Sequence, residues 1–112
     1  MVARAGQLRE WVTIQALTTS PDGQGGFTEA WGDIGTTPNV FARVQPLSGA
    51  ERVAAMQIDA RASHSVTVRY RSDITTAHRI KWGTRYLYPV GPWLNDDERG
   101  VLLTASCRED TD

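Results

Sequence analysis

The stretch Val101-Leu102-Leu103-Thr104-Ala105-Ser106-Cys107-Arg108 decides the fold class of this chain. Every second residue from Val101 to Cys107 is apolar or small, and a period of two places these side chains on one face of a β-strand. Apolar or small residues also occupy most positions on the other face. We therefore expect this strand to lie at the centre of a sheet.

The same alternation is found along the rest of the chain. It predicts further strands at residues 11–16, 27–31, 40–45, 66–71, 80–82 and 86–88. Residues 18–26 are dense in turn formers and predict a hairpin loop, and Gly83-Thr84 predicts a tight turn. Ser48 and Glu51 have the spacing of a capping box. In this motif the serine hydroxyl accepts a hydrogen bond from a backbone N–H of the first helical turn, and the glutamate reaches back, so a short helix is expected there. Its weak apolar face would comprise Val53, Ala54, Met56, Gln57 and Ala60.

These elements predict a single domain over residues 1–112 with a mainly β fold. Short strands joined by turn-rich loops, with one short helix, are typical of a small β-barrel or sandwich with long loops. A chain of 112 residues, 40% hydrophobic and 22% charged, suits one globular core. No apolar run approaches the ~20 residues of a membrane span, and the first residues lack the apolar core of a signal peptide. We expect a protein made in the cytoplasm, without a membrane partner.

The residues that could carry chemistry do not form a recognisable catalytic or metal-binding pattern. His64 and His78 lack cysteine or carboxylate neighbours at metal-ligand spacing. The glycines at residues 23–26 lack the Gly-Lys-Ser/Thr ending of a phosphate loop. Cys107 is the only cysteine, so no intrachain disulfide can form, and its apolar context predicts a small core residue. The sequence indicates neither an enzyme nor a cofactor.

Charge is distributed unevenly although the net charge is only −1. Residues 61–85 hold six cationic side chains against Asp73, a balance of 6 − 1 = +5, whereas residues 96–112 hold six acidic against two cationic, a balance of 2 − 6 = −4. Both regions could be solvated strand faces. Alternatively, a basic face of one subunit meets an acidic face of the next. All but one of the cationic residues are arginine, whose forked donors suit carboxylates, and this favours contacts.

Four tryptophans are many for a chain of this length. A small core does not easily enclose all of them, so some should mark contact surfaces, where large amphipathic rings are enriched. The alternative is that Trp11 and Trp82 complete the core and Trp93 covers its rim.

Several short motifs stand in a specific order along nearly the whole chain. They are residues 5–8 and 12–15, residues 22–26 leading to Trp31, residues 40–47 with Gly49 and Glu51, residues 64–70, Arg79-Ile80 with Gly83 and Tyr86, and residues 103–109. In order and spacing these motifs resemble those of the phage head-tail joining proteins, also called head-closure, head-completion or stopper proteins.

The resemblance implies a ring subunit at the neck of a tailed phage or a gene transfer agent, assembled in the bacterial cytoplasm. Such a ring closes the DNA-filled head and receives the tail. Its partners would be copies of itself, with a hexamer favoured over a dodecamer, a portal adaptor above, and a tail terminator or tail tube protein below. DNA would pass through the lumen without sequence-specific binding.

Two sets of residues are candidates for these contacts. A stopper needs a segment that reaches the lumen. The longest segment without a predicted strand runs from Leu47 to His64. Its polar and flexible residues are therefore the lumen candidates: Glu51, Arg52, Met56, Asp59 and Arg61. A closed ring needs two different complementary faces. The basic middle and the acidic end would supply them through Arg69, Arg71, Arg85, Asp96, Asp97, Glu98 and Glu109.

The rival function is a small nucleic-acid-binding β-barrel module. In that case Arg69, Arg71, Arg79 and Arg85 would contact phosphates, and Trp82, Tyr86 or Tyr88 would stack on bases. The negative net charge disfavours this function, because such modules usually carry a basic excess.

Overall fold

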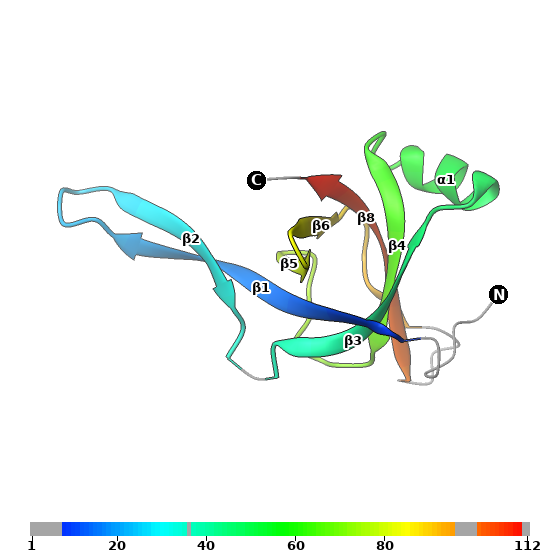
Figure 1. The fold of residues 1–112 in the computed structure, drawn as a ribbon. Coiled ribbons are helices and arrows are strands. Elements are labelled where there is room, and N and C mark those ends of the chain that lie inside the picture. Colours follow the sequence, from blue (N-terminus) through cyan, green and yellow to red (C-terminus); the bar gives the residue numbers. More distant parts are fainter. Residues whose placement is uncertain (1–7, 36, 96–100, 111–112) are drawn as a thin grey trace.

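The computed structural model describes residues 8–35, 37–95 and 101–110, and it is mainly β with one short helix (Figure 1). This confirms the predicted fold class. In chain order the elements are β1 Glu10–Pro21, β2 Phe27–Asp33, β3 Asn39–Pro46, α1 Gly49–Met56, β4 Ala62–Arg69, β5 His78–Trp82, β6 Arg85–Pro89, β7 Leu94–Asn95 and β8 Leu102–Asp110.

The strands pair in an antiparallel sheet that closes on itself. Its order is β2-β1-β3-β4-β8-β6-β5, and β5 also pairs with β1, from Thr13↔Lys81 to Ala16↔His78. The closed part therefore runs through β1, β3, β4, β8, β6 and β5, which we call the body. As predicted, β8 lies centrally, between β4 and β6, and β7 adds a short pairing at Leu94↔Thr104.

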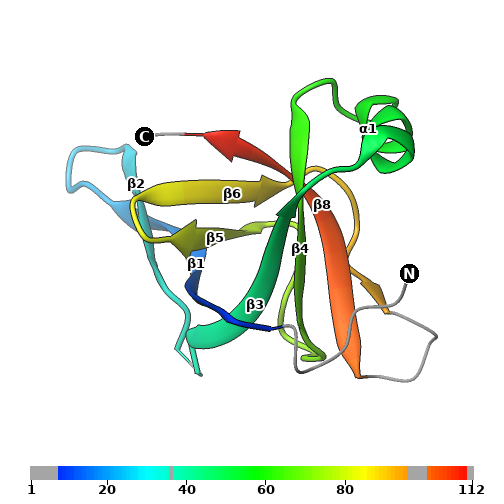
Figure 2. The same cartoon turned by 45° about the vertical axis from the view of Figure 1, so that its right-hand side comes forward.

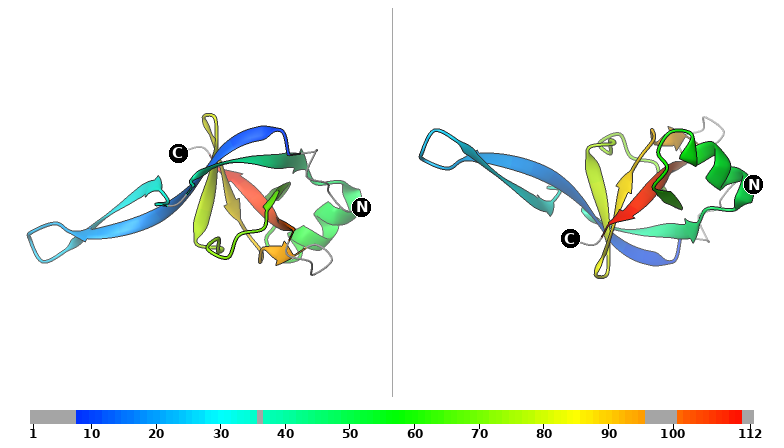
Figure 3. Two further views of the ribbon diagram at one scale, coloured as in Figure 1. Left: turned by 90° about the horizontal axis from the view of Figure 1, so that it is seen from below. Right: turned by 90° about the horizontal axis from the view of Figure 1, so that it is seen from above.

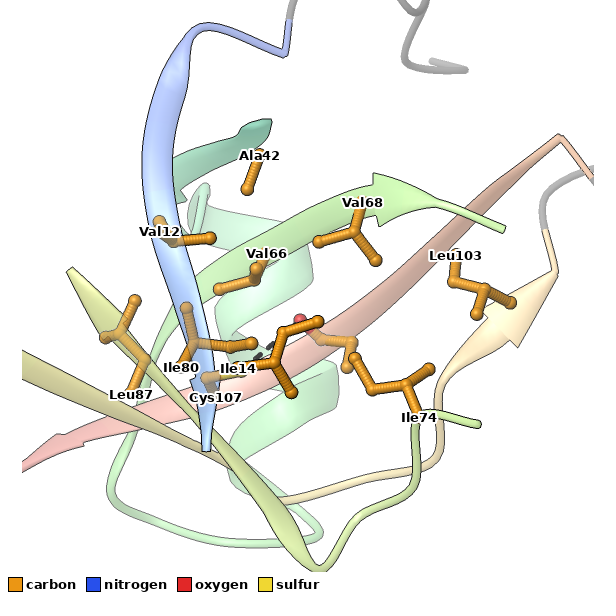
Figure 4. Packing of buried hydrophobic residues seen from close by; sticks show 11 residues of the cluster. Val12, Ile14, Ala42, Val66, Val68, Ile74, Ile80, Leu87, Leu103 and Cys107 are labelled. Atoms are coloured by element: carbon orange, nitrogen blue, oxygen red, sulfur yellow. Dashed lines mark hydrogen bonds between the residues drawn. The ribbon is translucent and has the colours of Figure 1, made fainter. Parts of the chain in front are cut away.

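The core fills the inside of the body (Figure 4). Inward-facing side chains from different strands meet there, among them Ile14, Val66, Ile80 and Leu87, and all four are fully buried. Cys107 is buried among them, as predicted, and burial raises the pKa of its thiol to about 12. Alternation with a period of two places these residues inside, because successive side chains of a strand point to opposite faces.

The far half of β1 leaves the body and pairs only with β2. Residues 17–31 form this hairpin, which we call the arm, and it projects well beyond the body (Figures 1 and 3). The predicted loop at residues 18–26 is wrong for residues 18–21, which continue β1. The turn itself is where it was expected: the Asp22 carboxylate accepts the backbone N–H groups of Gln24 and Gly26 at 2.7 and 3.1 Å. Gly23 and Gly25 have φ angles of 81° and 86°, which glycine adopts freely.

The helix begins where the sequence predicts, but its cap and its packing differ. The Ser48 hydroxyl donates to the Glu51 carboxylate at 2.5 Å and does not cap a backbone amide, so the two residues meet side chain to side chain and the expected capping box does not form. The predicted apolar face, including Val53 and Met56, is exposed, and the helix packs instead through Ala55. Among the described residues, no helix is long and apolar enough to cross a membrane.

Candidate contact surfaces

Most of the exposed large apolar side chains among the described residues lie in three parts of the surface, and Leu94 and Val101 are exposed as well. On the arm they are Leu17 and Phe27. Around the start of β3 and the end of β4 they are Trp11, Phe41 and Tyr70, and around α1 they are Val53, Met56 and Ile58. Large apolar side chains left in water at several neighbouring positions indicate surfaces that contact another molecule.

The base of the arm is fixed to the body by a buried arginine. Arg79, on β5, is 5% exposed, and its guanidinium carbon lies 4.4 Å from the ring centre of Trp31 and 4.0 Å from that of Tyr86. Its Nε donates to the Gln15 side-chain oxygen and its Nη1 to the Tyr88 hydroxyl, both at 2.8 Å. Trp31 also makes an edge contact with Tyr88, with ring centres 5.8 Å apart. Through Gln15 and Trp31 these contacts join β1 and β2 at the base of the arm to β5 and β6, so they fix the direction in which the arm leaves the body.

A groove of about 780 Å³ lies beside the paired rings of Trp11 and Phe41. Its apolar lining also includes Val40, Val68 and Tyr70, and its polar lining includes Arg69, Arg71 and Asp73.

The charged residues of the groove differ in their partners. Arg71 donates hydrogen bonds to the Asp73 carboxylate at 2.6 and 2.8 Å and to the backbone oxygen of Thr37 at 2.7 Å. The hydrogen bonds from Arg71 hold the pKa of Asp73 below the usual value. Within the described part of the chain, exposed Arg69 has no ion-pair partner. The groove thus offers aromatic rings together with one available cation.

The predicted lumen segment forms a projection on the outside of the body (Figure 2). Leu47, Ala55 and Ala62 make a small buried cluster that anchors it, with Val90 packed against them. Of its charges, Asp59 and Arg61 form a forked pair at 3.1 and 3.0 Å, whereas Glu51 and Arg52 lie exposed on α1 together with Met56. Of the charged residues in this segment, Asp59 and Arg61 therefore neutralise each other, whereas Glu51 and Arg52 remain exposed.

The predicted subunit-contact residues are only partly available for such contacts. Arg85 and Glu109 pair within the chain, with two nitrogen–oxygen distances of 2.6 and 2.7 Å. These hydrogen bonds lower the pKa of Glu109. Arg71 also has the intrachain partners described above, which leaves Arg69 as the predicted arginine without a partner in the described residues. Asp96, Asp97 and Glu98 lie outside the described residues.

The tryptophans divide between core and surface in a way that the sequence did not reveal. Trp82 and Trp93 pack against the core, as one alternative proposed. Trp11 does not complete the core: it is 56% exposed and stacks edge-on against Phe41. The contact between Trp31 and Arg79 was also not predicted from the sequence, because the two residues lie far apart along the chain and no local pattern links them.

The nucleic-acid alternative loses most of its proposed contacts. Arg79 is buried and cannot reach a phosphate, while Tyr86 and Tyr88 already hold cations against their rings, since Arg108 lies 4.4 Å from the Tyr88 centre. Arg85 covers the Trp82 ring at 4.4 Å. Stacking on bases needs exposed ring faces. No group of His, Cys, Asp or Glu suited to a metal ion occurs in residues 8–35, 37–95 and 101–110.

Comparison with known proteins identifies the family. A family model described as "Phage head completion protein" matches residues 3–110. The chain belongs to this family. The predicted resemblance is therefore confirmed, and membership assigns the chain a structural role in completing the phage head.

A solved structure supports the fold of this head completion protein. The solution structure of protein SF1141 from Shigella flexneri 2a is 32% identical, and the match covers 96% of each chain with a TM-score of 0.77. The search of curated proteins returned no match.

Proposed function

We propose that this chain is a ring subunit at the head-tail connector, where it closes the DNA-filled head and joins it to the tail. The family match over residues 3–110 is the observation that carries this proposal. The ring would be a hexamer, with a dodecamer as the alternative, between a portal adaptor above and a tail terminator or tail tube protein below. DNA would cross its lumen without sequence-specific binding.

The helical segment, residues 47–64, is proposed to face the lumen and to retain packaged DNA. It projects from the body, and Ile58 at its surface is 67% exposed. The exposed pair of opposite charges, Glu51 and Arg52, gives it no net attraction for phosphate, which suits a surface that DNA must pass. Its anchoring cluster keeps the base of the segment fixed while the exposed side chains stay available.

Arg69 is the residue that we propose for the ring contact. Arg71 and Arg85 would first have to leave intrachain carboxylates, whereas Arg69 would not. The sequence prediction paired these arginines with the acidic residues near 96–98 and 109–112 of the next subunit, and residues 96–98 lie outside the described residues.

Complementation of a phage that lacks its own copy tests this function. Without the protein, electron micrographs should show heads without tails, and nuclease treatment should digest DNA that leaves the heads. The wild-type gene should restore tailed, DNA-filled particles, as should the control Thr76→Ala at an exposed loop position. Tailed, DNA-filled particles in the absence of the protein would overturn the proposed function.

The lumen role is tested by replacing residues 53–58 with a Gly-Ser linker, which keeps the Asp59–Arg61 pair. This variant should fold, as circular dichroism can check, and should produce heads that lose DNA. Full retention of DNA by the folded variant would show that the helical segment is not the gate.

A further inference from the structure

We propose that the arm of one subunit docks into the groove of a second copy of this chain, with Phe27 against Trp11, Phe41 and Tyr70, and Glu29 paired with Arg69. The inference rests on the proposed ring and names the contact that builds it.

The arm is built as a surface that needs a partner. Beyond the Leu17↔Trp31 pairing it is a ribbon of two strands, and none of the other described strands pairs with either edge. Such ribbons are marginal in water, and unpaired strand edges bind other chains readily. Phe27, at the start of β2, is 73% exposed, and the described side chains of the body do not cover it. A partner that covers the tip would bury this ring.

The groove has the complementary shape and chemistry. Its volume of about 780 Å³ lies within the range of sites that enclose a drug-sized molecule, so a hairpin tip carrying one aromatic ring can enter it. Trp11, Phe41 and Tyr70 expose their rings there, and aromatic pairs gain energy beyond the area that they bury. Residues that carry much of the binding energy of an interface cluster near its centre in well-packed pockets, and large aromatic side chains are enriched among them.

The charges complement each other as well. Residues 17–33 contain three acidic residues and no lysine or arginine. Asp22 caps the turn, and Asp33 accepts a hydrogen bond from Gln15 at 3.1 Å, so Glu29 is the exposed carboxylate left without a partner in the described residues. Arg69, on the groove, is the matching cation without a partner.

The occupant is a second copy because the arm cannot reach its own groove. Trp11 lines the groove, Pro21 lies next to the turn at the tip of the arm, and both belong to the single strand β1. Ten residues of strand at ~3.3 Å each separate them by roughly 33 Å, and the arm points away from the body (Figures 1 and 3). Two different complementary surfaces on one chain make a head-to-tail contact, and such contacts close into rings when the rotation allows it.

Charge exchange in complemented particles tests the contact. Glu29→Arg and Arg69→Glu should each lower the count of tailed particles by about tenfold or more, because each places like charges together at the interface. The double variant should restore the count, and Thr84→Glu, at an exposed turn outside both surfaces, should leave it unchanged. Circular dichroism and denaturation of each purified variant check that the losses do not come from unfolding.

Chemical cross-linking gives an independent readout. Purified Thr28→Cys and Tyr70→Cys proteins, mixed and treated with a short bismaleimide, should form a covalent dimer that neither protein forms alone. Buried Cys107 should not react in the folded protein.

The outcomes separate this contact from the proposed function. If the single charge reversals leave tailed particles unchanged while loss of the gene abolishes them, the arm–groove contact is wrong and the function stands. Rescue of Arg69→Glu by Asp97→Arg, but not by Glu29→Arg, would overturn the contact and assign the acidic stretch as the partner.

Discussion

The body and the arm are built from the same strand, β1, yet they use it in opposite ways. Inside the body, Val12 and Ile14 are buried between β3 and β5. In the arm, the residues from Leu17 onward have one neighbouring strand and lie mostly in water. The body therefore holds the buried core, whereas the arm beyond Trp31 is a ribbon that lies mostly in water and packs little against its own subunit. The proposed docking of the arm into a second copy would bury part of this ribbon.

The largest effect should come from the core of the body. Ile80→Ala removes a fully buried side chain and should lower the free energy of unfolding by about 2–5 kcal/mol. Guanidinium denaturation followed by circular dichroism measures the loss. The matched control Ile58→Ala, at an exposed site, should change it by less than about 0.5 kcal/mol. Equal losses at both sites would contradict the division between body and projecting surfaces.

A smaller effect should come from the junction between body and arm. Arg79→Met keeps much of the side-chain volume but leaves the Gln15 oxygen and the Tyr88 hydroxyl without their donor, which should cost about 1–3 kcal/mol. Amide hydrogen exchange should also quicken in residues 17–31 more than in β4 or β8. Unchanged exchange in the arm would show that Arg79 does not fix it.

The surface pair Arg85–Glu109 should contribute less to the free energy of unfolding, and this contribution should disappear in acid. The pKa of Glu109 is lowered in the folded state, so its contribution is present above the unfolded value of about 4.3 and is lost as the pH falls through the folded value. Wild type should therefore exceed Glu109→Gln in stability at pH 7, and the difference should disappear towards pH 3. Denaturation curves at pH 7, 5 and 3 measure it. A difference that grows in acid would contradict the pair.

The smallest effect on stability should come from the arm itself. Replacing residues 18–30 by Asn-Gly joins Leu17 to Trp31 through a two-residue hairpin turn and keeps the Arg79 cluster. The free energy of unfolding should change by less than about 1 kcal/mol, because the removed ribbon buries little. The same variant should fail to complement the phage. A large loss of stability would show that the arm belongs to the folding unit of the body.

The comparison also explains which parts of the fold could be predicted. Strands with one buried face, such as β3 and β8, show a clear period of two, and their positions were predicted within a few residues. Residues 18–21 lack this period because both faces of the arm meet water, so polar residues there were mistaken for a loop. Exposed residues carry no burial pattern, and a functional ribbon is therefore hard to recognise from sequence.

The candidate contacts were predicted less well than the strands. The uneven distribution of charge along the chain indicated that arginines and carboxylates make contacts, and Arg69 remains a candidate contact. The pairing of Arg85 with Glu109, however, joins β6 to β8 within the chain, where the sequence suggested a contact between subunits. Charge counted along a chain cannot tell an internal pair from an external one.

The sequence by itself determined the mainly β class, the central position of the last strand, the turns at Asp22 and Gly83, and the family. Each of these depends on local alternation, on turn chemistry, or on motifs in order. The tertiary structure alone decided where β1 leaves the body, how Arg79 meets Trp31 and Tyr86, and that Trp11 lines a groove. These features join residues far apart in the chain, and their geometry exists only once the sheet has closed through β1 and β5.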